Sequence, residues 1–110
     1  MNSVLKTEVL QLHAEICGGL ADPNRILILY ELSLSPRNVT ELSINLKMSQ
    51  PLVSRHLKVL RERGMVVWER HGTAVEYTLS DHRLIEALDL LRAVLRDVLA
   101  KRAELAEAIA

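Results

Sequence analysis

The segment SQPLVSRHLKVLRERG, residues 49–64, carries polar and basic side chains at a spacing that gathers them on one side of a helix. Four side chains on that side donate hydrogen bonds, and two of them are cationic: Gln50, Ser54, Arg55 and Lys58. The opposite side is apolar and holds Val53, Leu57 and Leu60. The spacing therefore predicts a helix that packs on a core with one face and offers donors and positive charge to a partner with the other.

This positive charge is local. The chain has 14 Lys and Arg against 14 Asp and Glu, so its formal net charge is zero. Between residues 47 and 71, six basic residues stand against two acidic ones, whereas each flank has two more acidic than basic residues. A surface for phosphate groups and an ordinary solvated basic face both fit this distribution, and charge alone does not decide between them.

Composition excludes several classes of protein. With 110 residues, 49% of them apolar and no phenylalanine, the chain is expected to form one domain over residues 1–110 with a core of Leu, Val and Ile. No apolar run approaches the roughly 20 residues that cross a bilayer, and no secretion signal opens the chain, so we expect a cytoplasmic protein that does not enter a membrane. The single cysteine, Cys17, forms neither an internal disulfide nor a zinc knuckle by itself. We expect no cofactor and no metal site.

The chain before residue 49 is expected to hold three helices. Apolar residues recur every three to four positions from Val4 to Leu20, and the pair Gly18 and Gly19 weakens the end of this first helix. Asp22 followed by proline begins a second helix that stops before Pro36. In the third, Asn38 and a glutamate three residues later form a capping-box pattern. Ser49 is placed to cap the fourth.

After Gly64 the pattern changes to that of strands. Residues 65–79 alternate as in a hairpin, and residues 70–73 are predicted to form its tip. Trp68 and Tyr77 are predicted to pack this hairpin onto the helices, with stacking on nucleobases as the lesser alternative. Residues 81–110 then read as one long helix with an apolar seam: Leu84, Leu88, Leu91, Leu95 and Val98. A seam of this length needs a partner, so we expect a homodimer whose interface includes these five residues.

Together these elements predict a mainly α fold with a β-hairpin wing, that is, a winged helix-turn-helix that dimerises through its terminal helices. A helix of this kind enters the major groove of duplex DNA, and the tip of a wing meets neighbouring phosphates. Double-stranded DNA is therefore the expected partner. The residues expected to contact it are Gln50, Ser54, Arg55 and Lys58 on the helix, with Arg70 and His71 on the wing.

The sequence also bears on two other classes of function, an enzyme and a protein-binding scaffold. An enzyme needs a convergent polar constellation, but Ser54 and His56 are two positions apart on a helix and face different ways, so we expect no enzyme. A winged-helix scaffold that binds only proteins is the stronger alternative. The exposed Lys58 argues against it, because the centres of protein interfaces are depleted in lysine.

Three stretches, ADPNRILILYELS, NVTELSINLKMSQPLVSRHLKVLRERGMV and WERHGTAVEYTLSD, resemble the ArsR/SmtB family of winged-helix repressors over nearly the whole chain. The resemblance implies a dimer formed by the first and last helices, an inverted-repeat operator, and release of DNA when an effector binds. It also implies that Gln50, Pro51, Ser54 and Arg55 face the groove. His56 stands where the family often has histidine, and we interpret it as a structural residue.

The sequence departs from the family where many members bind metals. Soft-metal sensors carry two cysteines, one residue apart, at the start of the third helix, where this chain has Asn38 and Thr40. Zinc sensors use histidines and carboxylates of the last helix, at positions that here hold Asp81, Arg83, Val94 and Asp97. His82 is one residue away, which turns it by about 100° around the helix. Neither site is expected.

His13 and Cys17 remain as candidates for sensing. They are four residues apart on the first predicted helix and therefore share a face, with donors suited to zinc, copper or haem. Oxidation or modification of the Cys17 thiol is an equal alternative. Two ligands do not make a metal site, and an ordinary buried thiol beside a partly exposed histidine explains the same pair. The sequence does not determine whether an effector exists or what it is, and it does not determine the operator or the regulated genes.

Overall fold

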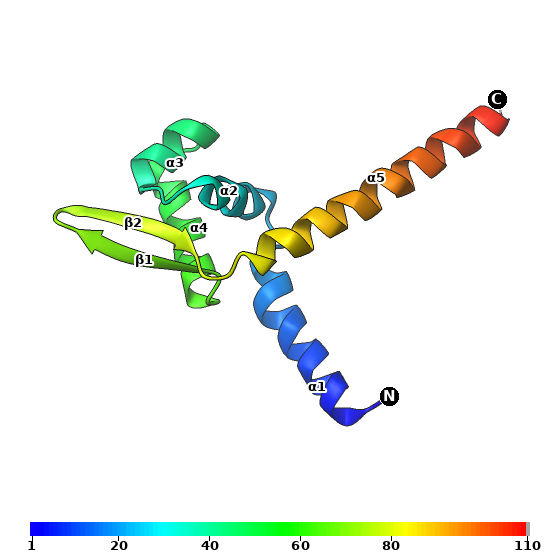
Figure 1. The fold of residues 1–110 in the computed structure, drawn as a ribbon, viewed down its shortest axis with the longest axis horizontal. Coiled ribbons are helices and arrows are strands. Elements are labelled where there is room, and N and C mark those ends of the chain that lie inside the picture. The colour runs from blue at the N-terminus through cyan, green and yellow to red at the C-terminus, as the bar shows by residue number, and fades with distance from the viewer. Residues whose placement is uncertain (110) are drawn as a thin grey trace.

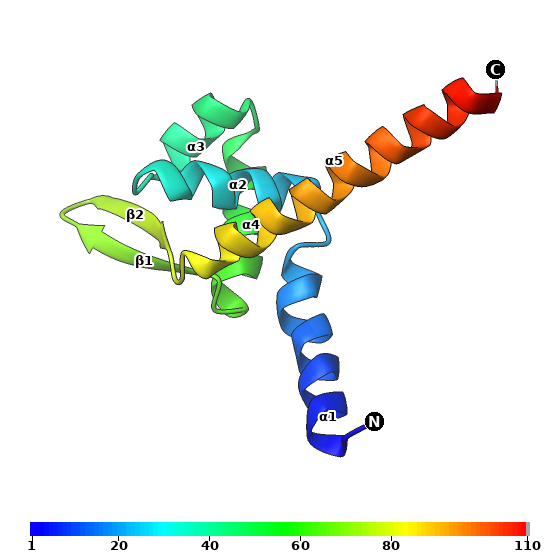
Figure 2. The same ribbon diagram turned by 45° about the vertical axis from the view of Figure 1, so that its right-hand side comes forward.

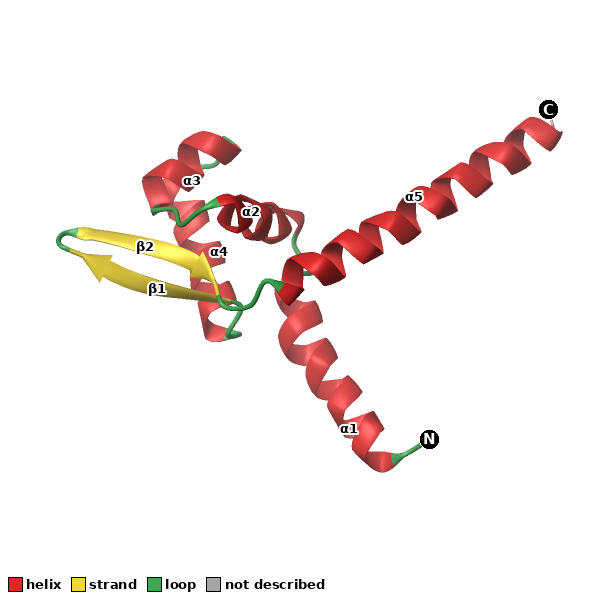
Figure 3. Cartoon of the chain, viewed as in Figure 1, coloured by secondary structure: helices red, strands yellow, loops and turns green. Residues whose placement is uncertain are grey.

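The computed structural model of the protein describes residues 1–109 and contains helices and one two-stranded antiparallel sheet (Figures 1 and 3). In chain order the elements are α1 (Ser3–Leu12), the π-helix η1 (His13–Cys17), α2 (Pro23–Leu34), α3 (Val39–Leu46), α4 (Gln50–Glu62), β1 (Val66–His71), β2 (Ala74–Leu79) and α5 (Arg83–Ile109). This order confirms the predicted mainly helical winged helix-turn-helix with a hairpin wing.

The helices begin at the predicted caps. The Asp22 carboxylate accepts a hydrogen bond from the backbone N–H of Asn24 at 2.8 Å. Asn38 and Glu41 bond each other's backbone N–H at 2.8 and 3.1 Å, which is a complete capping box. Ser49 accepts from the backbone N–H of Leu52 at 3.3 Å. Each cap satisfies donors that a helix N-terminus would otherwise leave free, so the boundaries follow from local chemistry.

The wing is a tight hairpin. Its strands pair in register from Val66 opposite Leu79 to His71 opposite Ala74. Gly72, with φ of +65°, makes the turn together with Thr73. Arg70 and His71 therefore belong to β1 itself rather than to the tip where the sequence pattern placed them.

A small aliphatic core joins α2, α3 and α4 to the base of the wing and the start of α5. Its buried residues are Ile28, Leu29, Leu32, Leu42, Val53, Leu57, Leu60, Met65, Val66, Leu79 and Leu88. Tyr77 packs against this core as predicted. The prediction for Trp68 is wrong, because its side chain is 44% exposed. Trp68 lies on β1, the outer strand of the wing, whereas Tyr77 opposite it lies on β2, which is hydrogen-bonded to Arg37 beside the helices.

Two helical arms project from this body in different directions, α1 toward the N-terminus and α5 toward the C-terminus (Figures 1 and 2). Their apolar side chains are largely uncovered. In α1 they include Val4, Leu5, Val9, Leu10 and Leu12, and in α5 Leu90, Leu91, Val94, Leu95, Val98, Leu99, Leu105 and Ile109. None of the helices described over residues 1–109 is long and apolar enough to cross a membrane.

The predicted seam of α5 divides into two parts. Leu88 is 5% exposed and belongs to the core of its own chain, and Leu84 packs beside it. Leu91, Leu95 and Val98 lie beyond the body and are 61%, 53% and 39% exposed. Only these last three are therefore free surface among the five residues expected at a dimer interface.

Candidate nucleic-acid interface

Helix α4 has one buried and one exposed side. Val53, His56, Leu57 and Leu60 are buried, so the helix docks on the core through them. The structure places on the exposed side all five residues of α4 that the sequence suggested for DNA contact: Gln50, Pro51, Ser54, Arg55 and Lys58. Of the polar ones, Gln50, Ser54 and Arg55 lie in the N-terminal half of the helix. This is the part that reaches base edges when a helix enters the major groove.

The turn between α3 and α4 holds these two helices in a fixed relation. Lys47 ends α3 in the left-handed conformation, with φ of +54°. The next backbone N–H, that of Met48, donates to the carbonyl oxygen of Ser43 at 3.1 Å. At the exposed surface the Gln50 amide donates to the Thr40 hydroxyl at 3.5 Å. The N-termini of the two helices therefore lie side by side.

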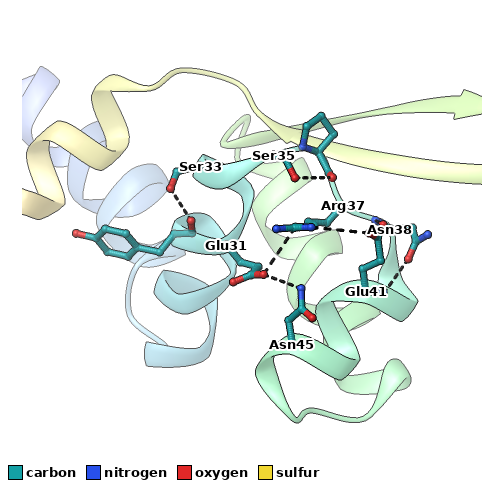
Figure 4. Close-up of polar contacts among 9 residues, drawn as sticks. Glu31, Ser33, Ser35, Arg37, Asn38, Glu41 and Asn45 are labelled. Atoms are coloured by element: carbon teal, nitrogen blue, oxygen red, sulfur yellow. Dashed lines mark hydrogen bonds and ion pairs between the residues drawn. The ribbon is translucent and has the colours of Figure 1, made fainter.

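Arg37 links α2, α3 and the wing (Figure 4). Its guanidinium lies 3.7 Å from the carboxylate of Glu31 and 3.9 Å from that of Glu41. The amide of Asn45 donates to the same Glu31 carboxylate at 2.7 Å. Through its backbone, Arg37 also exchanges two hydrogen bonds with Tyr77 of β2, at 2.8 and 3.1 Å. The wing is therefore anchored to the helices beside α4.

Arg70 and His71 lie on opposite faces of the wing. Successive side chains of a strand alternate between faces, and Val66, which is buried, marks the face toward the core. Arg70 shares that face, is exposed, and has no ion-pair partner within residues 1–109. His71 is on the outer face, where its Nε2 lies 3.7 Å from the Glu69 carboxylate and 3.4 Å from that of Glu76.

The two faces therefore differ in charge. The Glu69 and Glu76 carboxylates stand directly opposite each other and repel phosphate, so the outer face is a poor surface for DNA. On α4, Lys58 forms only an exposed pair with Glu62 at 3.9 Å, which costs little to break. Arg55 has no polar partner in the part of the chain that the structure describes. Among the residues that the sequence suggested for DNA contact, Arg55 and Arg70 are therefore the cations without an ion-pair partner within residues 1–109.

His56 is buried on the inner side of α4, as the structural interpretation predicted, and it is 7% exposed. Burial lowers the pKa of its imidazole; Arg25 and Arg55 lower it further, while Asp22 opposes them. The neutral ring is therefore the folded form at physiological pH.

The candidate sensing residues lie on η1. His13 and Cys17 are both exposed in the single chain, so Cys17 is not the buried thiol that one interpretation assumed. The sequence pattern did not reveal that this turn is a π-helix, a form that often marks functional sites. Within residues 1–109, no three His, Cys, Asp or Glu side chains are grouped as a metal site requires.

Two of the positions compared above with metal ligands, Asn38 and Asp81, have structural roles here. Asn38 completes the capping box of α3. Asp81 accepts from the backbone N–H of Arg83 at 2.8 Å and pairs with its guanidinium at 2.7 Å. These hydrogen bonds lower the pKa of the Asp81 carboxyl to about 2. Each residue therefore holds the N-terminus of a helix.

Comparison with known proteins gives consistent similarities. Residues 22–67 match the family described as bacterial regulatory protein, arsR family. The chain is 47% identical over 77 residues to the HTH-type transcriptional repressor SmtB of Mycobacterium tuberculosis, a match that covers 70% of this chain and 57% of SmtB. It thus spans less than two thirds of that relative. Rv0081 of the same organism, described as an uncharacterized HTH-type transcriptional regulator, is 37% identical over 98 residues, which are 88% of this chain and 86% of Rv0081.

Solved structures agree with the sequence matches. The crystal structure of Rv0081 superposes with a TM-score of 0.76 and 34% identity, and the match covers 94% of this chain and 99% of that one. The solution structure of the homodimeric winged helix-turn-helix domain Mb0332 of Mycobacterium bovis, described as a possible ArsR-family regulator, gives a TM-score of 0.75 at 26% identity. That match covers 89% of this chain and 91% of the domain.

Proposed function

Because the chain belongs to the ArsR/SmtB family of DNA-binding transcriptional regulators and is not an enzyme, we propose that it is a homodimeric repressor of an inverted-repeat operator. In this proposal the domain spans residues 1–110, and α4 is the recognition helix. An effector releases the DNA.

The observation that carries the proposal is the exposed row of α4. Gln50, Ser54 and Arg55 offer an amide, a hydroxyl and a guanidinium on the exposed side of one helix. Arginine pairs with two acceptors of guanine, and glutamine with the two groups of adenine, in the major groove. In this proposal Pro51, next to Gln50, contacts apolar base edges. Lys58, further along the helix, contacts the DNA backbone. This row combines base recognition with phosphate binding.

The wing adds a phosphate contact through Arg70. We assign His71 a smaller part than the sequence suggested, because its imidazole lies between the carboxylates of Glu69 and Glu76. The Arg70 guanidinium has no such competitor, so a phosphate is its natural partner.

The arms supply the dimer. Leu91, Leu95 and Val98 of α5 and the apolar side chains of α1 form exposed surface on two helices that leave the body. Covering such surface is a main driving force for association. The similar domain Mb0332 is homodimeric, which supports a dimer for this chain as well. A two-fold dimer matches an inverted repeat, because each recognition helix then meets an identical half-site.

We place the effector response at η1, where the exposed Cys17 and His13 lie at the base of the α1 arm. A modification or ligand at η1 changes the conformation of the segment that joins α1 to the body of the protein. A change of a few kcal/mol between two arrangements of a dimer is enough to release DNA.

The test is selection of DNA from a fragmented genomic pool with the purified protein, followed by sequencing of the bound fragments. The proposal predicts one enriched inverted repeat whose half-sites are a helical turn, or a multiple of it, apart. It also predicts binding that weakens steeply with salt, since bound cations displace counterions from DNA. A protein-binding scaffold predicts neither enrichment nor a salt-dependent complex, and that result would refute the proposal.

A further inference from the structure

The N-terminal arm is fastened to the end of α4 by Arg63. This residue caps the C-terminus of α4, and its guanidinium donates hydrogen bonds to the carbonyl oxygens of Ala14 and Glu15 in η1, the latter at 3.1 Å. Ala14 and Glu15 precede Arg63 by 49 and 48 positions in the sequence. A single side chain thus connects the root of the arm to the last turn of the proposed recognition helix.

A second guanidinium holds the same region from the other side. Arg25, in the first turn of α2, donates through Nε to the carbonyl oxygen of Gly19 at 2.8 Å and through Nη2 to that of Gly18 at 3.2 Å. Its third nitrogen, Nη1, lies 3.5 Å from Nδ1 of His56, in the middle of α4. Arg25 therefore bridges the connection between arm and body to the buried side of α4.

The two glycines permit this close approach. A Cβ atom built on Gly18 would lie 2.7 Å from Nη1 of Arg63, and one built on Gly19 would lie 2.5 Å from the sulfur of Met65. Any other residue at position 18 would displace the Arg63 guanidinium from its carbonyl partners. Residues 13–19, which we term the joint, are therefore shaped around these side chains.

We propose that Arg25 and Arg63 are positioning residues that fix the angle between the α1 arm and α4, and thereby the separation and rotation of the two recognition helices in the dimer. The proposal rests on the proposed function, because the angle has consequences only in a dimer joined through the arms. Charge-assisted hydrogen bonds to backbone carbonyls are stronger and more directional than apolar contacts, so they suit a fixed angle.

A fixed angle makes the protein sensitive to the distance between half-sites. One added base pair moves a half-site along the DNA and rotates it by about 34°. A stiff dimer then loses contacts in one of the two grooves, whereas a dimer with a loose joint adapts to several spacings. Spacing preference is therefore the property that these arginines control, distinct from stability and from the contacts of one recognition helix.

The experiment measures dissociation constants by fluorescence anisotropy on four duplexes: the operator selected by the wild-type protein, the same operator with one or two base pairs added at its centre, and a duplex with a single half-site. The variants are Arg63→Met, Arg25→Lys and Gly18→Ala. Arg61→Met is the matched control, because it removes an equal charge from an exposed arginine two positions earlier on α4. Urea unfolding of each variant is measured in parallel.

We expect the wild type to prefer the natural spacing by at least about tenfold. Arg63→Met and Gly18→Ala should reduce that preference to less than about threefold and leave single half-site affinity within about twofold of the wild type. Arg25→Lys should act in the same direction, because an ammonium cannot reach both carbonyls and His56 together. Arg61→Met should weaken binding by the same factor on every duplex and keep the preference.

A uniform loss for Arg63→Met on all four duplexes, equal to that of the control, would overturn the proposal, since Arg63 would then be a phosphate contact. Unfolding of both Arg63→Met and Gly18→Ala would also overturn it, since the joint would then serve stability alone. If the wild type itself binds two half-sites no better than one, the proposed dimeric repressor fails first, and this result differs from a failure of the positioning role.

Discussion

The guanidinium of Arg25 faces Nδ1 of His56 at 3.5 Å, inside the body of the protein. Because arginine only donates, Nδ1 must accept, and the proton of the neutral ring lies on Nε2. That nitrogen is buried and has no partner within residues 1–109. A second proton would have to go on Nδ1, against the guanidinium, so both burial and Arg25 favour the neutral imidazole.

The first prediction is that acid destabilises the fold through His56. Its pKa is lowered in the folded protein from the ordinary value of 6.5, so below about pH 6.5 the unfolded chain binds more protons than the folded one. The contribution of His56 to the free energy of unfolding is therefore fully present above that pH. It decreases as the pH falls toward the folded pKa, by up to about 1.4 kcal/mol per pH unit. Urea unfolding between pH 7.5 and 5 should show this slope in the wild type and a smaller one in His56→Asn. His82→Asn, at an exposed histidine, should retain the wild-type slope; equal slopes in all three proteins would contradict the assignment.

The second prediction separates the two glycines of the joint. Gly19→Ala should cost about 1–3 kcal/mol of unfolding free energy, because its methyl group meets the sulfur of Met65, which is fully buried and cannot move aside. Gly18→Ala should cost less than about 1 kcal/mol, because its methyl group meets only the far end of the long Arg63 side chain, which can be displaced into solvent, and alanine favours the helix. Thermal and urea unfolding give both values. Equal losses of unfolding free energy in Gly18→Ala and Gly19→Ala would contradict this distinction between their contacts with Arg63 and Met65.

The third prediction concerns the α5 arm. Leu95→Asp should give a folded monomer, because this side chain is 53% exposed and lies on the proposed dimer surface. Leu88→Asp should instead unfold the protein, because an unpaired carboxylate would enter the core. Analytical ultracentrifugation and circular dichroism distinguish these results. Leu34→Asp, at a leucine of α2 that is 72% exposed, is the control and should stay dimeric; a dimeric Leu95→Asp would remove α5 from the interface.

The fourth prediction concerns release from DNA. If an effector acts at η1, one of zinc, copper, arsenite, haem or peroxide should lower the affinity of the wild type for its operator, and Cys17→Ser should lose this response. The reason is that Cys17 is the only thiol in the chain and is exposed at the root of the arm. Anisotropy with each agent in turn provides the measurement. An equal response in both proteins would show that Cys17 does not sense that agent.

Local chemistry made most of the fold predictable. Asp22, Asn38 and Ser49 each carry a side chain that satisfies the free N–H groups at a helix start, and each begins the helix expected of it. The two sides of α4 were equally clear, because a helix period separates Leu57 from Lys58 without knowledge of the rest of the chain. These features depend on residues within about one turn of each other.

What the sequence did not reveal depends on distant residues. The bonds from Arg63 to Ala14 and Glu15 join segments that only the tertiary fold brings together, and no periodicity encodes them. The same holds for Leu88, whose place in an apolar seam looks identical to that of Leu95 until the start of α5 is seen to pack on the body. The carboxylates that surround His71 could have been suspected from strand alternation, since Glu69 shares its face.

The central claim is that α4 recognises bases while the wing binds the backbone, and the most direct test compares Arg55→Ala and Arg70→Ala on the operator and on a random duplex over a range of salt concentrations. Arg55→Ala should lose about 1–3 kcal/mol of binding free energy on the operator and little on random DNA. Arg70→Ala should weaken both complexes alike and reduce the salt slope by about one. If the two substitutions have the same effect on both duplexes, α4 does not recognise bases through Arg55, and the account is wrong.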